Sequence, residues 1–395
     1  MDYRAYWIWL QHAFGEGSPL PWQLSRRFHG GAAEFHEGGP RLWNSLSFLS
    51  DQQAAALYDF TLGEAEARLE YAEKVGWFVL TPECEKYPEA LRNISDPPAV
   101  LYGKGRLPEF GKGPAVAVAG ARKALQESVA AARKIGYQLA AGGALVVSGG
   151  AVGIDSASLA GAMSASGRVI SVLPVDLNSP YLAKNASLRQ EIPKRGGALL
   201  SEYFTQRNPA MGGFQTRNRL ITGLCDGVVL IQAAMKSGTI IYARHAADQN
   251  RDVFVYPGPA GAAEYAGSQA LLRDGAKAVS CGEDVLEDYA LRFPLPRKEP
   301  ACLPDEYEGI FDDICLPERE AVLADSAGGA VSFGPGLSPE EEKVMSALQG
   351  HLLTAAQLGA DTGIPAGQLL GLLTEMELEG LVESVSGKRY RRLRR

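Results

Sequence analysis

Short apolar runs alternate with helical stretches through the middle of the chain, and this pattern predicts a parallel sheet covered by helices. The runs do not alternate between apolar and polar positions, which is typical of strands that are buried on both faces. Ligands of such sheets bind at the carboxyl ends of the strands. The predicted strands are 115–119, 144–147, 169–173, 198–200, 227–231 and 253–256, and the predicted helices are 128–141, 156–165, 220–224 and 239–248.

A helical region is expected before the sheet. Apolar residues stand at helical spacing at Trp7 with Leu10 and at Leu24 with Phe28. Ser50 with Gln53 three residues later forms a capping-box pattern. A further helix is predicted over 64–75, and Trp77-Phe78-Val79-Leu80 reads as a strand. We therefore expect a helical domain over residues 1–75 and an extended Rossmann-like domain over 76–282.

The sequence after residue 282 predicts a linker and a small third domain. Residues 283–336 are acidic, contain proline and lack periodicity, which is typical of a linker. Residues 337–395 predict three helices and a hairpin, which is a winged-helix pattern. Its signals are capping boxes at Ser338/Glu341 and Thr354/Gln357, a helix over 368–379, and strands over 381–385 and 389–393 around Ser386-Gly387.

Composition indicates the general class of protein. The chain has 395 residues, of which 46% are hydrophobic and 22% are charged, so several globular domains are expected. No run approaches the roughly 20 apolar residues of a membrane span, and the first residues lack a signal-peptide profile. Five cysteines are scattered without metal-ligand spacing. These features predict a reduced cytoplasmic protein without a metal site or membrane association.

The distribution of charge predicts a polyanionic partner. The formal net charge is −7, but residues 283–325 hold 13 acids and 4 bases, a net of −9. Taking −9 out of −7 leaves +2 for the rest of the chain. Residues 181–251 hold 10 bases and 4 acids, a net of +6, and six bases crowd the last eight residues. Two basic regions are thus available to attract nucleic acid.

Four loop-like motifs fall where predicted strands give way to helices. Glycine lets a backbone approach a ligand closely, and the first turn of a helix presents free N–H groups to an anion. With arginine nearby, such an edge suits the phosphates of a nucleotide or of a nucleic-acid strand. The motifs are Ala119-Gly120-Ala121-Arg122, Ser148-Gly149-Gly150-Ala151-Val152-Gly153-Ile154-Asp155, Arg217-Asn218-Arg219 and Ser237-Gly238-Thr239.

The arginines of these motifs have two interpretations. Arg122 ends a buried strand, where a cation is costly without an anionic partner, so it either contacts phosphate or forms a structural ion pair. Arg217-Asn218-Arg219 precedes the run Leu220–Leu224 and is expected in the first turn of a helix. Cations there oppose the helix dipole. Anion binding or a solvated helix end would explain them.

No catalytic constellation is visible in the sequence. The five histidines are dispersed and form no pattern with serine, cysteine or aspartate. Asp155 and Asp176 read as helix-cap and turn residues. The lysine motif of P-loop nucleotide-binding proteins is absent from the sequence.

An ordered series of short motifs resembles the DNA-processing protein A family of bacteria (DprA, also called Smf), and it covers nearly the whole chain. The motifs are Tyr87-Pro88 with Leu91, Asp96-Pro97-Pro98, Leu101–Gly105, Ser148-Gly149, Gly153-Ile154-Asp155, Asn185 with Leu188, Ser201-Glu202-Tyr203, Phe214 with Arg217-Asn218-Arg219, Ser237-Gly238-Thr239, Arg251, Pro257-Gly258, Gly267-Ser268 with Leu271, and Gly275-Ala276.

The resemblance implies a helical domain of sterile-alpha-motif type, an extended Rossmann domain and a winged helix. It also implies a homodimer that binds single-stranded DNA and helps load the RecA recombinase during natural transformation, without enzymatic activity or a cofactor. The candidate DNA-binding residues are Arg122, Ser148, Gly149, Gly153, Lys184, Asn185, Arg217, Asn218, Arg219, Ser237, Gly238 and Thr239. Cations and backbone N–H donors of this kind give salt-dependent, sequence-tolerant binding.

Several neutral positions depart from the family pattern: Ser158, Val175, Leu182, Gln232 and Tyr242. An alternative is a nucleotide-binding or nucleotide-cleaving enzyme on a related Rossmann scaffold, but Gly238-Thr239 lacks the glutamate that follows in such enzymes. A third hypothesis is a regulatory protein that acts mainly through the winged helix. Its helix over 368–379 has few bases, which favours protein contact over reading of the major groove.

Overall fold

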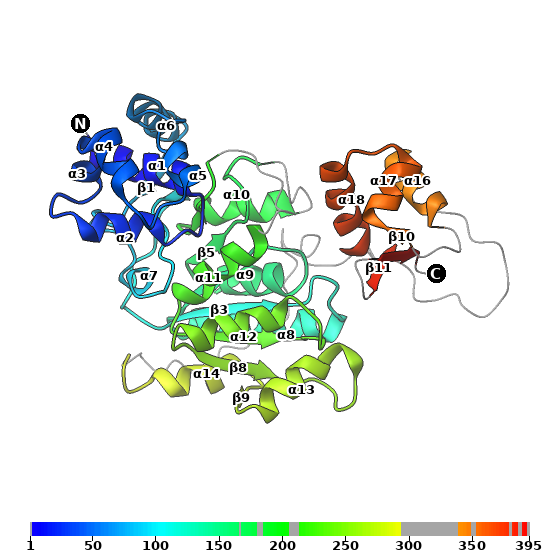
Figure 1. Ribbon diagram of the computed structural model, residues 1–395. Helices are drawn as coiled ribbons and strands as arrows, with labels where there is room; N and C mark the ends of the chain where they lie inside the picture. The colour runs from blue at the N-terminus through cyan, green and yellow to red at the C-terminus, as the bar shows by residue number, and fades with distance from the viewer. Residues whose placement is uncertain are drawn as a thin grey trace. The chain divides into compact units, whose positions relative to one another are not determined.

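The computed structural model describes residues 2–165, 167–179, 185–204, 213–293, 339–348, 353–378, 381–385 and 389–392. The described residues up to 293 belong to one compact unit, and those from 339 onward belong to a second (Figure 1). The first unit holds the N-terminal helices and the large sheet. The second holds the small C-terminal fold.

The chain begins with helices that pack around an aromatic core. Helix α1 buries Trp7 and Leu10, the stripe expected from the sequence, and Leu24 is buried beside them. The predicted capping box of Ser50 and Gln53 is confirmed, and Thr61 with Glu64 forms a second one. The helices are α1 (Tyr3–Phe14), α2 (Leu20–Arg27), α3 (Gly31–Glu37), α4 (Gly39–Ser45), α5 (Asp51–Ala56) and α6 (Leu62–Lys74).

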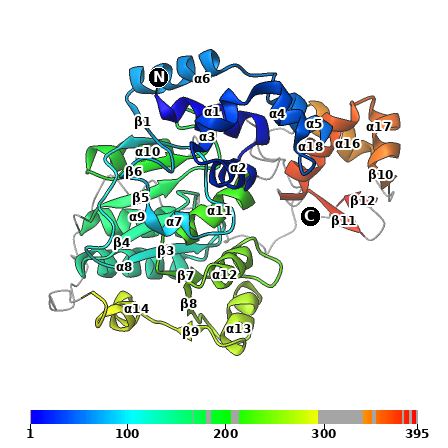
Figure 2. The same cartoon turned by 60° about the vertical axis from the view of Figure 1, so that its left-hand side comes forward.

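A nine-stranded sheet forms the centre of the first unit. Its order is β1-β2-β6-β5-β4-β3-β7-β8-β9. Figure 2 labels these strands, apart from β2, from top to bottom. The strands from β3 to β9 pair in parallel, as the sequence predicted, whereas β1 and β2 join antiparallel at one edge. The strands are β1 (Trp77–Leu80), β2 (Leu101–Gly105), β3 (Ala115–Gly120), β4 (Leu145–Ser148), β5 (Val169–Val172), β6 (Ala198–Ser201), β7 (Gly227–Ile231), β8 (Asp252–Tyr256) and β9 (Lys277–Ala278).

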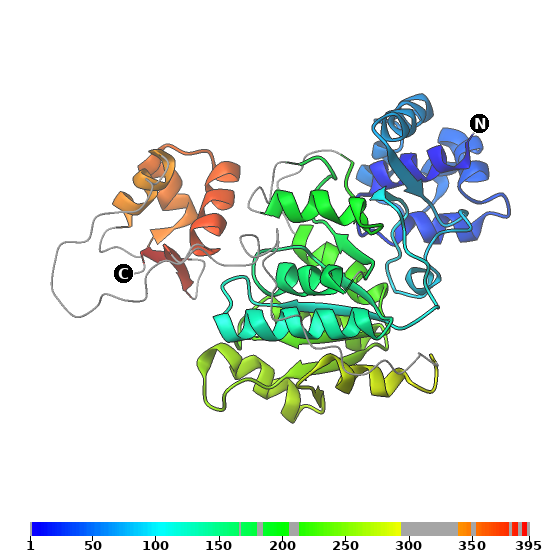
Figure 3. The same cartoon turned by 180° about the vertical axis from the view of Figure 1, so that it is seen from behind.

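Helices cover both faces of this sheet. Helices α8 and α9 pack together on one face, and α11 and α12 lie on the other, as Figures 1 and 3 show from opposite sides. This three-layer arrangement confirms the expected α/β class. The helices are α7 (Glu89–Arg92), α8 (Gln126–Ala141), α9 (Ile154–Ser164), α10 (Ala186–Lys194), α11 (Gly213–Gly223), α12 (Thr239–Asp248), α13 (Ala266–Arg273) and α14 (Gly282–Tyr289), with the 3-10 turn η3 (Ala263–Tyr265).

Buried polar contacts join the N-terminal helices to the sheet. The Gln11 side chain of α1 donates to the Glu202 carbonyl at 2.7 Å and accepts from the Val100 amide at 2.8 Å. Trp22 Nε1 donates to the Pro98 carbonyl. Because buried amides need their partners, these bonds fix the helices against the sheet.

The acidic linker does not begin at residue 283 as predicted, because this residue lies in a helix. Residues 282–289 form α14, whose first turn carries Glu283 and Asp284, where acids complement the helix dipole. Asp284 Oδ2 accepts from the Ser280 amide at 2.6 Å, and the Gly282 amide donates to Gln138 Oε1 at 2.9 Å. The acids thus cap a helix that docks on α8. The stretch 294–338 lies outside the described residues.

The second unit is a winged helix. Apolar residues from its helices and strand β11 form a separate core that includes Val344, Leu358, Leu369, Leu373 and Met376. The predicted capping box of Thr354 and Gln357 is confirmed, whereas Ser338 lies outside the described residues. The elements are α16 (Pro339–Ala347), β10 (Leu353–Thr354), α17 (Ala355–Thr362), α18 (Ala366–Leu378), β11 (Val382–Val385) and β12 (Arg389–Arg392), with β12 central in an antiparallel sheet.

Candidate nucleic-acid interface

The sheet has a topological switch point between β3 and β7. The chain proceeds from β3 through β4, β5 and β6 on one side and from β7 to β8 and β9 on the other. Loops that follow two such strands diverge, and the crevice between them is where open α/β sheets bind ligands. In this sheet the rule points to the region beyond the last register pair, Gly120 and Ile231, where a Cβ at Gly120 would overlap the Ile231 carbonyl. Only glycine lets the two strands approach there.

The loop after β3 presents the exposed cations of this edge. Arg122 and Lys123 are both exposed, and the Arg122 guanidinium carbon lies 4.2 Å from the centre of the Phe214 ring of α11. A cation over an aromatic face is attracted by the ring quadrupole. Arg122 forms no ion pair among the described contacts, although its charge also opposes the rise that burial causes in the pKa of Asp155, and its side chain is exposed.

The glycine-rich loop after β4 packs against the backbone that carries Arg122. Ser148 Oγ donates to the Val118 carbonyl at 2.6 Å, which directs the hydroxyl into the sheet. Gly153 has a φ of 90°, and a Cβ there would overlap the carbonyls of Ala121 and Arg122. The Ile154 amide, at the start of α9, donates to the Ala121 carbonyl at 3.2 Å. Glycine is needed at position 153 because the loop after β4 packs closely on the loop after β3.

Arg217 is buried beneath that loop. Its side chain is 3% exposed, and Nη1 donates to the carbonyl of Val172 at 2.6 Å, at the end of β5. A Cβ at Gly149 would overlap the same guanidinium. Burial raises the pKa of Asp155, and the nearby charge of Arg217 opposes that rise. Arg217 thus compensates a buried carboxyl and holds the ends of two strands together.

Arg219 belongs to a buried ionic cluster. Its side chain is 2% exposed, and Nη2 donates to both carboxylate oxygens of Glu202 at 2.7 and 2.8 Å. Nε lies 3.1 Å from Asp96 Oδ2, at ion-pair distance but without hydrogen-bond geometry. Burial raises the pKa of Glu202, and Arg219 opposes that rise. The carboxylates of Glu202 and Asp96 therefore supply the negative charge that we expected to find beside Arg219.

The Arg-Asn-Arg segment does not lie in the first turn of its helix. Helix α11 begins by Gly213, so residues 217–219 occupy its second turn. The expected conflict with the helix dipole therefore does not arise, because the dipole acts mainly at the ends. Asn218 is buried between the two arginines, and its Oδ1 has no hydrogen-bond partner among the described residues.

The other candidate residues lie on neighbouring strand ends. Asn185 is buried at the start of α10 and donates to the Gly150 carbonyl at 2.9 Å, and its Oδ1 lacks a partner in the described part of the chain. Lys184 lies outside the described residues. Ser237 and Gly238 form the turn before α12, and Thr239 begins that helix. All of these described residues follow the carboxyl ends of β4 to β7.

The described residues that depart from the family pattern are buried and make contacts within the fold. Ser158 is buried in α9 and donates to the Asp155 carbonyl at 2.9 Å. The Val175 carbonyl accepts from Ser201 Oγ at 2.6 Å. Tyr242 is buried in α12, and burial raises the pKa of its hydroxyl. Leu182 lies outside the described residues. Gln232 bridges two loops, as described below.

Sequence reasoning missed Lys123 and Lys236 as members of this surface. Both are exposed, and Lys236 lies on the loop after β7, the strand that pairs with β3. Phe214 was recognised only as part of a motif, although its ring contacts Arg122. A count of bases within the strand-end loops, apart from named motifs, would have found the two lysines.

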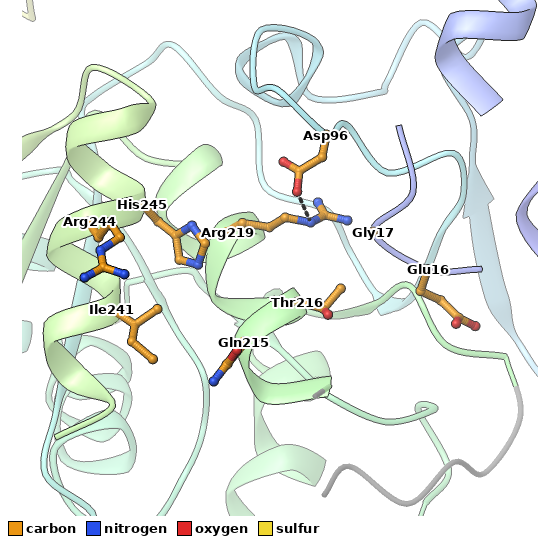
Figure 4. Close-up of a pocket in the computed structure, with 9 residues that line it drawn as sticks. All are labelled: Glu16, Gly17, Asp96, Gln215, Thr216, Arg219, Ile241, Arg244 and His245. Atoms are coloured by element: carbon orange, nitrogen blue, oxygen red, sulfur yellow. Dashed lines mark ion pairs between the residues drawn. The ribbon is translucent and has the colours of Figure 1, made fainter. Parts of the chain in front are cut away.

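A separate open pocket of about 440 Å³ lies between the N-terminal segment, α11 and α12 (Figure 4). Arg219 and Asp96 pair on one side of it, and His245 and Arg244 lie on the other. Burial lowers the pKa of His245, and the charge of Asp96 opposes this change. The walls mix both signs of charge. Within the described residues, no group of three potential ligands for a metal ion is found.

Comparison with known proteins decides the family. The model described as DNA recombination-mediator protein A matches residues 78–290, and the model described as DprA winged helix domain matches residues 333–388. The chain belongs to the DNA recombination-mediator protein A family. The first match alone spans more than half of the chain and covers the sheet that carries the switch-point crevice.

Relatives of this family agree over most of the chain. Protein Smf of Synechocystis sp. is 33% identical over 322 residues, which are 79% of each chain. Protein Smf of Escherichia coli is 31% identical over 88% of this chain and 86% of its own. The X-ray structure of DNA processing protein A from Streptococcus pneumoniae superposes with a TM-score of 0.62 at 27% identity, covering 73% of this chain and 99% of that one. The family, the fold and a role in DNA recombination are thereby shown. No helix among the described residues is long and apolar enough to cross a membrane.

Proposed function

We propose that this recombination mediator binds single-stranded DNA along the carboxyl-end edge of the sheet, with Arg122 and Lys123 as the principal phosphate contacts. The observation that carries the proposal is the exposed pair of cations on an anchored loop beside the switch-point crevice. Phosphate contacts from such cations are tolerant of sequence and sensitive to salt. Unpaired bases can also stack on nearby side chains, which duplex DNA does not allow.

Buried arginines have a different part in this proposal. Arg217 and Arg219 keep the strand ends and α11 in place, so they support the DNA-binding edge from beneath. Ser148, Gly149, Gly153, Asn185, Asn218, Ser237, Gly238 and Thr239 would shape the surface and supply backbone donors. Lys184, just before Asn185 in the chain, would add a further cation.

We propose further that the protein acts as a homodimer that delivers the bound strand to the RecA recombinase during natural transformation, in the cytoplasm and without catalysis of its own. The family relationship to DNA-processing proteins supports this role. A winged helix with few bases on its third helix favours a protein contact for that unit. The acidic stretch between the units would keep the strand away from the linker by like-charge repulsion.

The direct test is fluorescence anisotropy of a labelled oligo-dT against the purified full chain over a salt series. We expect affinity that falls steeply and linearly in a double-logarithmic plot against salt, and weaker binding to a duplex of equal length. Salt-independent binding, or none at low salt, would contradict the proposal. The RecA step is tested by the rate of RecA filament assembly on strands coated with single-strand-binding protein, which the full chain should increase.

A further inference from the structure

Gln232 has a backbone conformation that is unusual for its residue type. It follows β7 directly, is buried, and has a φ of 54°, in the left-handed region that favours glycine. The other described non-glycine residue with positive φ is Asn250, a type that tolerates this region. A glutamine there is strained, and such strain persists only where surrounding contacts enforce it.

The contacts of the Gln232 side chain explain the conformation. Oε1 accepts from the Leu125 amide at 2.8 Å, and Nε2 donates to the Lys123 carbonyl at 3.4 Å. The amide therefore spans the crevice and ties the loop after β3 to the loop after β7. Both an acceptor and a donor are used, so a carboxylate at this position could make the first bond but not the second.

The loop after β3 is held from its other side as well. The Ile154 amide donates to the Ala121 carbonyl, and Gly153 packs against the backbone of Ala121 and Arg122. One anchor thus precedes the exposed cations, and the Gln232 anchor follows them. Arg122 and Lys123 project from a segment whose backbone is fixed at both ends.

We infer that Gln232 is the positioning residue of the DNA-binding edge, which holds the Arg122–Lys123 backbone in its strand-binding arrangement before the strand arrives. This inference rests on the function proposed above. Ordering a residue on binding costs ~1–2 kcal/mol, so releasing this anchor should weaken the binding of oligo-dT by about 10-fold, since 1.4 kcal/mol is a factor of ten.

The decisive variant is Gln232→Met, which keeps the length of the side chain and removes its donor and acceptor. Two quantities are measured in the full chain: the affinity for labelled oligo-dT, and the hydrogen exchange of the Leu125 amide. We expect the affinity to fall about 10-fold and the Leu125 amide to exchange faster. The midpoint of thermal unfolding should fall, because the bonds to Leu125 and Lys123 are lost. A merely structural role would lower the midpoint in the same way but leave the affinity of the folded protein unchanged.

A second variant keeps the test decisive if the first folds poorly. Gln232→Glu retains the acceptor for the Leu125 amide, so protection of that amide should be preserved while the bond to Lys123 is lost. Ala234→Glu is the matched control, because it adds the same charge at an exposed position of the same loop without touching the bridge. Weaker binding by Gln232→Glu than by Ala234→Glu supports the positioning role, and equal binding contradicts it.

The outcomes separate this inference from the function on which it rests. Failure of the unaltered chain to bind oligo-dT would overturn the proposed function and the positioning role together. Wild-type affinity in Gln232→Met, combined with faster exchange of the Leu125 amide, would overturn the positioning role alone. Unchanged exchange would show that the bridge is not formed in solution, which overturns it as well.

Discussion

Two pairs of basic residues lie near the same edge of the sheet, and they differ in burial and in hydrogen-bond partners. Arg122 and Lys123 are exposed on a loop, with an aromatic ring beneath the arginine. Arg217 and Arg219 are almost fully buried and bind a strand-end carbonyl and a carboxylate. Internal groups already take the charge of the buried pair, so the proposed contact with the phosphates falls to the exposed pair.

The difference has a simple origin in the chain. Glu202 follows β6 and is buried in the same unit, so a buried cation must accompany it. Arg219 meets that need from α11, and Arg217 stands beside the buried Asp155. Among the described residues Arg122 and Lys123 form no ion pair with a carboxylate, although the charge of Arg122 also opposes the rise that burial causes in the pKa of Asp155. Both side chains stay exposed, which leaves them accessible to a ligand.

Removal of Arg219 should have the largest effect on stability. In Arg219→Ala the Glu202 carboxylate stays buried without its partner, and breaking a buried pair in this way costs about 3–5 kcal/mol. The free energy of unfolding is measured by urea denaturation. Arg244→Ala is the matched control, because Arg244 lines the same pocket but is exposed (Figure 4); its change should stay within about 0.5 kcal/mol. Equal losses of stability in the two variants would show that the buried pair with Glu202 does not stabilise the fold.

Removal of Arg217 should have the next largest effect. The Val172 carbonyl would lose its donor, and an unsatisfied buried acceptor costs ~1–3 kcal/mol, to which the lost packing against Gly149 adds. We expect a loss of about 3 kcal/mol in the same urea experiment. Gln215→Ala, an exposed change on the same helix, serves as control. A stable Arg217→Ala protein with lost DNA affinity would assign Arg217 to the strand itself.

Lys236 tests how far the exposed surface extends across the crevice. Lys236→Ala should reduce the slope of log affinity against log salt by about 0.7, the contribution of one phosphate contact on a single strand. Its free energy of unfolding should be unchanged, because the side chain is exposed. Anisotropy over a salt series measures the slope. An unaltered slope would confine the strand to the side of the crevice that carries Arg122.

The smallest effect is expected from the titration of His245. Burial lowers the pKa of this histidine below its ordinary value, so the folded state binds its proton less tightly than the unfolded state. Its contribution to stability is therefore complete above the unfolded pKa of about 6.5 and is lost as pH falls through the lowered folded value. His245→Gln should flatten this part of the stability profile between pH 7 and pH 5. An identical profile in the variant would exclude the contribution.

The sequence predicted the fold well wherever periodicity was strong. The strand 227–231 and the helix 239–248 are confirmed at both ends, because a run of buried β-branched residues and a turn before a helix leave few alternatives. The strand β2, next to the edge strand β1, was not predicted: three of its five residues are exposed or glycine, so it lacks a continuous apolar run. Helix α14 was mistaken for linker because its acids dominated the composition, although they cap its first turn.

The sequence predicted that the strand-end motifs meet at one edge of the sheet, but not the state of each side chain. The structure brings the described motifs to that edge because parallel strands end together. Whether an arginine is buried depends on a carboxylate far away in sequence, such as Glu202 for Arg219 or Asp155 for Arg217, and spacing along the chain does not reveal that pairing. The bridge made by Gln232 likewise joins positions more than 100 residues apart.

One experiment separates the exposed pair, which we propose holds the strand, from the buried pair, which holds the fold. Oligo-dT binding by Arg122→Ala/Lys123→Ala is followed by anisotropy over a salt series, beside urea denaturation of the same protein. We expect a slope smaller by about 1.4, the contribution of two phosphate contacts, with the free energy of unfolding within about 0.5 kcal/mol of the unaltered chain. Unchanged affinity and slope in a stably folded variant would contradict this proposal.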